Sequence, residues 1–277
     1  MDAPINQVFF PSSFHELFSA WSRFPDAVPY AGGTDLIWRQ GKNILDLPRV
    51  ILSLDKLDEL HRITRTEHYI EIGSMVKLNR IIWLGKVVPD ILCNCLENIG
   101  GVQLRNIATI GGNICCPARP LDSSAPLTAL DAQYELRNAS SSRWVAASRF
   151  HSPVERAVLE KQEILTRVRL PLAQWDYSIY KKFYSEDIND SKVMVFLAKT
   201  QKNILSDIRV IYKGSVVLRN KIGEGILAGK SLPLSRKIAG DFVDDWNKFL
   251  AENKKLDEFT KHELLGCIEM NVYNLSV

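Results

Sequence analysis

Two pairs of adjacent glycines carry the clearest chemical signal in this sequence. Gly32-Gly33 lies in YAGGTDL, before Thr34 and Asp35. Gly111-Gly112 lies in RNIATIGGNICC, before Asn113. Consecutive glycine N–H groups can form a concave nest that binds phosphate, and the missing Cβ lets a ligand come close. Two such pairs, each followed by polar residues, indicate two loops that bind a pyrophosphate from both sides. The alternative interpretation is that each pair forms an ordinary tight turn.

A third glycine-rich stretch, GEGILAGKS at residues 223–231, resembles two nucleotide-binding motifs but fits neither. A phosphate-binding loop of the form G-x-x-x-x-G-K-[ST] needs a glycine where Glu224 stands. A dinucleotide fingerprint needs its third glycine one residue earlier and a strand–helix unit around it. We expect a surface turn before a helix here.

The five cysteines form no metal or disulfide pattern. Cys93 and Cys95 are two residues apart on a predicted helix, so they face different directions. Cys115 and Cys116 could add two ligands, but partners at zinc spacing are missing. We therefore expect buried thiols and no metal site. An odd cysteine number without disulfide spacing favours a reduced, cytoplasmic protein.

Composition limits the protein to an ordinary globular class. The chain has 277 residues, 46% hydrophobic and 24% charged, which predicts one large domain or two moderate ones. A net charge of +3 is too small to favour nucleic acid. No window approaches the roughly 20 apolar residues of a membrane span. The N-terminus lacks the basic start and apolar stretch of a signal peptide.

Around the glycine pairs, the sequence predicts alternating strands and helices. Ser13 and Glu16 form a capping box, and the apolar face of the following helix should end before Pro25. Residues 27–31 should form a strand leading into the first pair. Further strands are expected over residues 49–57, 68–74, 126–138 and 163–172, and helices over 77–85 and 89–101.

A change to polar composition predicts a domain boundary near residues 171–178. We therefore divide the chain into residues 1–175 and 176–277. The second part should contain strands over residues 193–200, 207–214 and 216–220, and helices over 234–253 and 259–275.

The two glycine motifs in this order resemble those of the FAD-binding subunit of molybdenum hydroxylases. This family includes xanthine dehydrogenase and carbon monoxide dehydrogenase. The resemblance covers nearly the whole chain and is carried by YAGGTDL, IEIGSMVKLNRI, QLRNIATIGGNI, DSSAPLTALDAQYEL, IYKKF and IRVIYKGSVVLRNKIGEGILAGKSL.

This resemblance implies an α+β fold. It has a two-part FAD-binding domain of the PCMH type over residues 1–175, and a smaller C-terminal α/β domain with an antiparallel sheet and helices. Both glycine loops would hold the pyrophosphate of non-covalently bound FAD. No catalytic residue is assigned. The residues implied in cofactor binding are Ala31, Gly32, Gly33, Thr34, Asp35, Thr109, Ile110, Gly111, Gly112, Asn113, Asp122, and Lys181 or Lys182.

The implied function is electron transfer within a heteromeric complex. FAD would receive electrons from iron–sulfur centres and pass them to NAD or another acceptor. Partner subunits would carry molybdopterin and the 2Fe–2S cluster. One alternative is a stand-alone FAD-dependent oxidoreductase, for which Cys115 or Cys116 could anchor the flavin. Another is a non-catalytic nucleotide-binding scaffold, because KKFYSEDIND lacks an arginine that the family often has.

Overall fold

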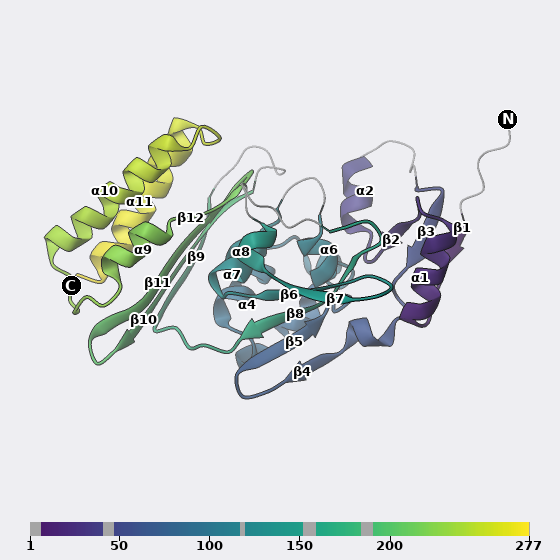
Figure 1. Cartoon of the computed structure of the whole chain (residues 1–277). Coiled ribbons are helices and arrows are strands. Elements are labelled where there is room, and N and C mark those ends of the chain that lie inside the picture. The colour runs from purple at the N-terminus through teal and green to yellow at the C-terminus, as the bar shows by residue number, and fades with distance from the viewer. Residues whose placement is uncertain (1–6, 41–46, 117–119, 152–158, 184–190, 277) are drawn as a thin grey trace.

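The computed structural model describes residues 7–40, 47–116, 120–151, 159–183 and 191–276. Within these ranges the strands form three sheets (Figure 1). The stretch of KKFYSEDIND after Phe183, where the family arginine is missing, lies outside the described residues. No described helix has the length and apolar character needed to cross a membrane.

The N-terminal sheet is parallel and carries the first glycine pair at one end. Its strand order is β1 (Gln7–Phe9), β3 (Val50–Ser53) and β2 (Val28–Tyr30). Helix α1 (Phe14–Arg23) packs on it, and α2 (Thr34–Gln40) follows the glycines. The predicted cap of α1 is confirmed, since the Ser13 hydroxyl accepts from Glu16 N at 3.2 Å.

The middle part contains a five-stranded antiparallel sheet in the order β4-β5-β8-β6-β7. These strands are β4 (Ile63–Arg65), β5 (Tyr69–Gly73), β8 (Ile164–Pro171), β6 (Gln133–Arg137) and β7 (Ser142–Ala146). The helical elements of this part are η1 (Asp58–His61), α3 (Leu78–Ile82), η2 (Gly85–Val87), α4 (Asp90–Glu97), α5 (Val102–Arg105), α6 (Ile110–Ile114), α7 (Ser124–Ala129) and α8 (Ala147–Phe150).

The single strand predicted over residues 126–138 is wrong in its first half. Residues 124–129 form the short helix α7, and only residues 133–137 form strand β6. Every residue of α7 is buried, so its apolar run has no polar face to show the helical period. Asp131, at φ 53°, makes the turn between the two elements.

The C-terminal part has an antiparallel sheet in the order β12-β11-β10-β9. Its strands are β9 (Tyr177–Phe183), β10 (Lys192–Gln201), β11 (Ile204–Lys213) and β12 (Val217–Arg219), and its helices are α9 (Lys221–Leu227), α10 (Arg236–Glu252) and α11 (Glu258–Asn274). The three helices cover the outer face of the sheet (Figure 1). The inner face packs on α4 and α7. A division between residues 175 and 176 stays a prediction.

The surface turn predicted for residues 223–231 is wrong over its first half, because α9 extends through Leu227. The Asn220 side chain caps this helix by accepting from Gly223 N at 3.0 Å. Leu227 is fully buried against the outer core. A cap that lies before the glycines and a buried apolar residue outweigh the low helix propensity of glycine.

Candidate functional site

The first glycine loop connects β2 to α2, and several of its N–H groups have no backbone partner in the part of the chain that the structure describes. Gly33 has φ +68°, which glycine adopts readily and other residues rarely do. Among the described residues, no backbone carbonyl accepts from the N–H groups of Gly32, Gly33, Thr34 or Asp35. This loop therefore offers hydrogen-bond donors to an anionic group.

The second glycine pair uses its N–H groups inside the protein. Gly111 N donates to the Ser74 carbonyl at 2.8 Å, and Gly112 N donates to the Thr109 hydroxyl at 3.0 Å. Thr109 thereby caps α6, on which both glycines lie. Both donors of this pair are thus bonded within the protein, and a role of the pair as an anion-binding nest stays a prediction.

The two glycines of the second pair avoid contacts with different parts of the protein. A Cβ on Gly111 would lie 2.6 Å from the Ser74 Cβ, so packing against residue 74 requires a glycine. A Cβ on Gly112 would lie 3.0 Å from the Thr109 hydroxyl and 4.0 Å from the Ala31 Cβ. Gly112 thus faces the first glycine loop, while Gly111 faces the protein interior.

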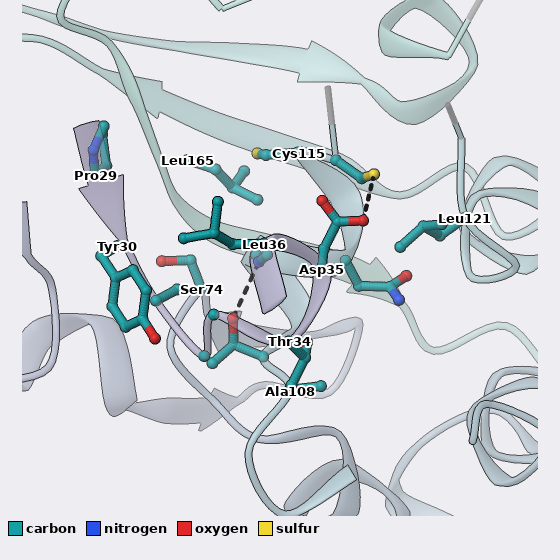
Figure 2. Close-up of a pocket in the computed structure, with 18 of the residues that line it drawn as sticks. Pro29, Tyr30, Thr34, Asp35, Leu36, Ser74, Ala108, Cys115, Leu121 and Leu165 are labelled. Carbon is teal, nitrogen blue, oxygen red and sulfur yellow. Dashed lines mark hydrogen bonds between the residues drawn. The ribbon is translucent and has the colours of Figure 1, made fainter. Parts of the chain in front are cut away.

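Both loops open into one cavity of about 560 Å³. This volume is within the roughly 300–1,000 Å³ of small-molecule and cofactor sites. Figure 2 shows Thr34 and Asp35 of the first loop among the residues that line the cavity, together with Ser74 and Cys115. The predicted site residues that line it are Ala31, Gly32, Gly33, Thr34, Asp35, Thr109, Gly111, Gly112, Asn113, Asp122 and Lys182.

Two predicted residues do not line this cavity. Ile110 is 1% exposed and belongs to the hydrophobic core. Lys181 pairs with Met194, whose side chain lies in the outer core under the helices. Lys182 pairs with Val193, whose side chain lies in the inner core, so Lys182 is on the cavity side of β9. The structure thereby separates two lysines whose register the sequence left open.

Asp122 lies in the cavity wall and pairs with two lysines. Its Oδ2 lies 3.0 Å from Lys182 Nζ and its Oδ1 lies 3.3 Å from Lys213 Nζ. Burial raises the pKa of this carboxyl, but the charge of Lys213, the Ser191 hydroxyl and Lys182 together outweigh burial and hold the pKa below its ordinary value. Asp122 is therefore ionised at neutral pH.

Lys213 and Ser74 line the cavity and were not among the predicted site residues. Lys213 could have been noticed in DIRVIYKG, because a lysine continues the period-2 face that Ile211 starts. The Ser74 hydroxyl is buried and has no hydrogen-bond partner among the residues that the structure describes. A buried orphan hydroxyl beside a cavity is available to a ligand.

Two thiols follow α6 and also line the cavity. The Cys116 Sγ lies 3.5 Å from Asp35 Oδ1, which joins the two loops, and Arg39 pairs with the same carboxylate at 2.8 Å. Burial, and secondarily Cys116, raise the pKa of Cys115 to about 12. In the described part of the chain, no three His, Cys, Asp or Glu side chains are grouped so as to hold a metal ion.

Comparison with known proteins gives one family. Residues 4–173 match the family described as the FAD binding domain in molybdopterin dehydrogenase. The glyceraldehyde dehydrogenase medium chain of Sulfolobus acidocaldarius is 29% identical over 78% of this chain and 76% of its own length. The xanthine dehydrogenase FAD-binding subunit of Escherichia coli O157:H7 is 35% identical over 53% of this chain. That match spans only 51% of the relative's length.

Solved structures share the fold over the whole chain. Carbon monoxide dehydrogenase from Hydrogenophaga pseudoflava superposes with a TM-score of 0.81 and 23% identity, covering 100% of this chain and 98% of the other. Quinoline 2-oxidoreductase from Pseudomonas putida 86 gives 0.80 and 19%, with the same coverage. These likenesses confirm the predicted α+β fold. Because the family match runs through both glycine loops and Asp122, the chain belongs to the FAD-binding domains of molybdopterin dehydrogenases, a family of oxidoreductases.

Proposed function

We propose that this chain is the electron-transferring FAD subunit of a molybdenum hydroxylase complex and binds FAD non-covalently in the 560 Å³ cavity. The observation that carries this proposal is that separate segments of the chain meet at one cavity. Both glycine loops, Asp122 and Lys182 come from distant parts of the sequence and line the same space. Two unrelated tight turns would have no reason to share a cavity.

The residues of the cavity fit a dinucleotide. The N–H groups of residues 32–35 have no backbone partner in the described ranges and would donate to the diphosphate. The Ser74 hydroxyl, buried without a partner among the described residues, would bond to a polar group of the cofactor. Leu104 and Leu165 add apolar surface that excludes water. When bound, the flavin would supply the redox chemistry, which no protein side chain can replace.

The state of the neighbouring thiol supports non-covalent binding. A cysteine attacks a flavin ring as the thiolate, and burial raises the pKa of Cys115 to about 12. Cys115 is therefore a neutral thiol at physiological pH and a poor nucleophile. This favours the subunit over a stand-alone enzyme with flavin anchored at Cys115.

The partners in this proposal follow from the relatives. One is named a medium chain, and others are named FAD-binding subunits of xanthine and nicotinate dehydrogenases. A separate FAD subunit would receive electrons from a 2Fe–2S subunit, which in turn is reduced by a molybdopterin subunit. The acceptor would be NAD or another oxidant, and the complex would be cytoplasmic.

Cofactor binding is tested with the purified chain. We expect a yellow protein whose visible absorbance bleaches with dithionite and whose flavin stays in solution after acid precipitation of the protein. Flavin in the pellet would contradict non-covalent binding. A chain that takes up no FAD after reconstitution would favour the nucleotide-binding scaffold.

Assembly is tested by coexpression with the genes that neighbour this one. We expect the chain alone to reduce an artificial dye with NADH if NAD is the acceptor, and to hydroxylate neither purine nor aldehyde. Coexpression should raise its gel-filtration mass and give hydroxylation of one such substrate. Hydroxylation by the lone chain would contradict the subunit assignment.

A further inference from the structure

A buried lysine lies beside the cavity at the end of β11. The Lys213 side chain is 1% exposed. Its ammonium group lies 3.3 Å from Asp122 Oδ1 and donates to the Ser191 carbonyl. Burying an ammonium group costs free energy even when it is paired. An apolar residue at this position would continue the buried inner face of β11. Packing alone therefore does not account for a lysine at position 213.

Lys213 and Lys182 differ in their access to solvent, although both pair with Asp122. The Lys182 side chain is 38% exposed and also donates to the Asn98 carbonyl at 3.1 Å. Water screens the charge of an exposed lysine, so its effect on the carboxyl is weaker than its distance indicates. The buried Lys213 acts through protein of lower polarity. Lys213 is therefore the stronger of the two cations toward Asp122.

Two further titratable groups among the described residues face Asp122, and both are neutral. Burial raises the pKa of Cys95, on α4, and the pKa of Tyr180, on β9, well above the physiological range. Within the described part of the chain, the charged groups paired at this wall are the Asp122 carboxylate and the ammonium groups of Lys182 and Lys213. A carboxylate has about four lone-pair directions, so Asp122 can still accept hydrogen bonds from a molecule in the cavity.

We propose that Lys213 is a positioning residue for FAD. It holds the Asp122 carboxylate ionised and fixed at the cavity wall, where that carboxylate accepts hydrogen bonds from the cofactor. Lys213 acts through Asp122 and makes no essential contact with FAD itself. This inference rests on FAD binding in the same cavity, as proposed above.

The test is the pH profile of FAD binding to apoprotein, followed by flavin fluorescence from pH 5.5 to 8. In the wild-type protein Asp122 stays ionised across this range and contributes no pH dependence. In Lys213→Met the buried carboxyl loses its strongest cationic partner among the described residues and keeps the screened Lys182 and the Ser191 hydroxyl, so we expect it to take up a proton within the range. We expect FAD affinity of this variant to fall about tenfold from pH 8 to 5.5, relative to wild type.

Two further variants separate positioning from a structural role. Lys213→Arg keeps the charge and should restore the wild-type pH profile. Lys213→Met with Asp122→Asn removes the titrating group, so the added pH dependence should disappear. A Lys213→Met protein that binds FAD more weakly but with the wild-type pH profile would overturn the proposal.

If Lys213→Met alone does not fold, Asp122→Asn is compared with the double variant, which has lost both buried charges. Action through Asp122 predicts that adding Lys213→Met causes no further loss of FAD affinity. A further loss of about tenfold would show a direct contact with FAD and overturn the proposal. Failure of the wild-type protein to bind FAD would instead contradict the proposed function, so the two failures are distinguishable.

Discussion

Gly32 packs directly against the backbone of Ile107. A Cβ on Gly32 would lie 2.4 Å from the Ile107 carbonyl oxygen and 3.2 Å from the Cα of Ala108. The first glycine loop therefore contacts the chain that leads into the second. Glycine at position 32 sets the distance between the loops, so it shapes the cavity even without touching a ligand.

We predict that Gly32→Ala separates the two loops. Backbone must move to relieve the 2.4 Å contact, which should cost about 1–3 kcal/mol of unfolding free energy and weaken FAD binding. Denaturant unfolding and FAD titration measure the two effects. Gly266→Ala is the control, because Gly266 lies within helix α11 and an added Cβ would meet no described atom within 4 Å besides its chain neighbours and the backbone of its own helix. This control should stabilise the helix by about 0.5–1 kcal/mol. Equal behaviour of the two variants would contradict the contact.

Gly111 and Gly112 should respond differently to alanine. At Gly111 the new Cβ meets Ser74 at 2.6 Å, so the apoprotein should lose stability. At Gly112 it meets the Thr109 hydroxyl at 3.0 Å and otherwise points toward Ala31, so the main loss should be in FAD affinity. Thermal unfolding of both apoproteins and FAD titration test this contrast. A Gly112→Ala protein that binds FAD like wild type would argue against a cofactor contact there.

Lys182→Ala should weaken FAD binding about threefold to tenfold, because the cavity loses a cation that pairs with Asp122. Lys181→Ala is the matched control, since its neighbour on β10 faces the outer core. FAD titration of both variants at low and moderate salt is the measurement. A larger effect of Lys181→Ala would mean that the other face of β9 serves the cofactor.

The pairing of Asp122 predicts a contribution to acid unfolding. Because the pKa of Asp122 is lowered in the folded state, its stabilising effect is complete above the ordinary pKa of about 4. That effect is lost as the pH falls through the lowered folded pKa. Asp122→Asn should be about 3 kcal/mol less stable than wild type at pH 7. The difference should shrink below pH 4 in denaturant unfolding curves. A difference that is constant with pH would rule out this linkage.

FAD should protect the thiols that line the cavity. We expect Cys115 and Cys116 to react with a maleimide several-fold more slowly in the FAD-bound protein, at a common pH. Cys267 on α11 is the internal control, because it does not line the cavity and should react equally in both forms. Peptide mass analysis after labelling assigns each rate. Equal protection of all three cysteines would indicate global stabilisation rather than a nearby ligand.

Local sequence patterns were sufficient to predict the features that depend on neighbouring residues. The Ser13 cap fixes the start of α1, because its hydroxyl bonds to a backbone group three residues away. The order of the two glycine motifs pointed to the family, since each is a short local pattern. The alternation within residues 68–74 likewise indicated β5, because period 2 is a property of the strand alone.

Contacts between distant segments follow from the packing of the folded chain. This packing places Lys182 rather than Lys181 at the cavity, because the inner and outer cores on β10 fix the face of β9. It brings Lys213 within 3.3 Å of Asp122, 91 positions earlier in the chain. It shows that Gly111 accommodates Ser74. These contacts are made by packing between distant segments, and no property of the local sequence specifies which distant atom will occupy the space beside a side chain.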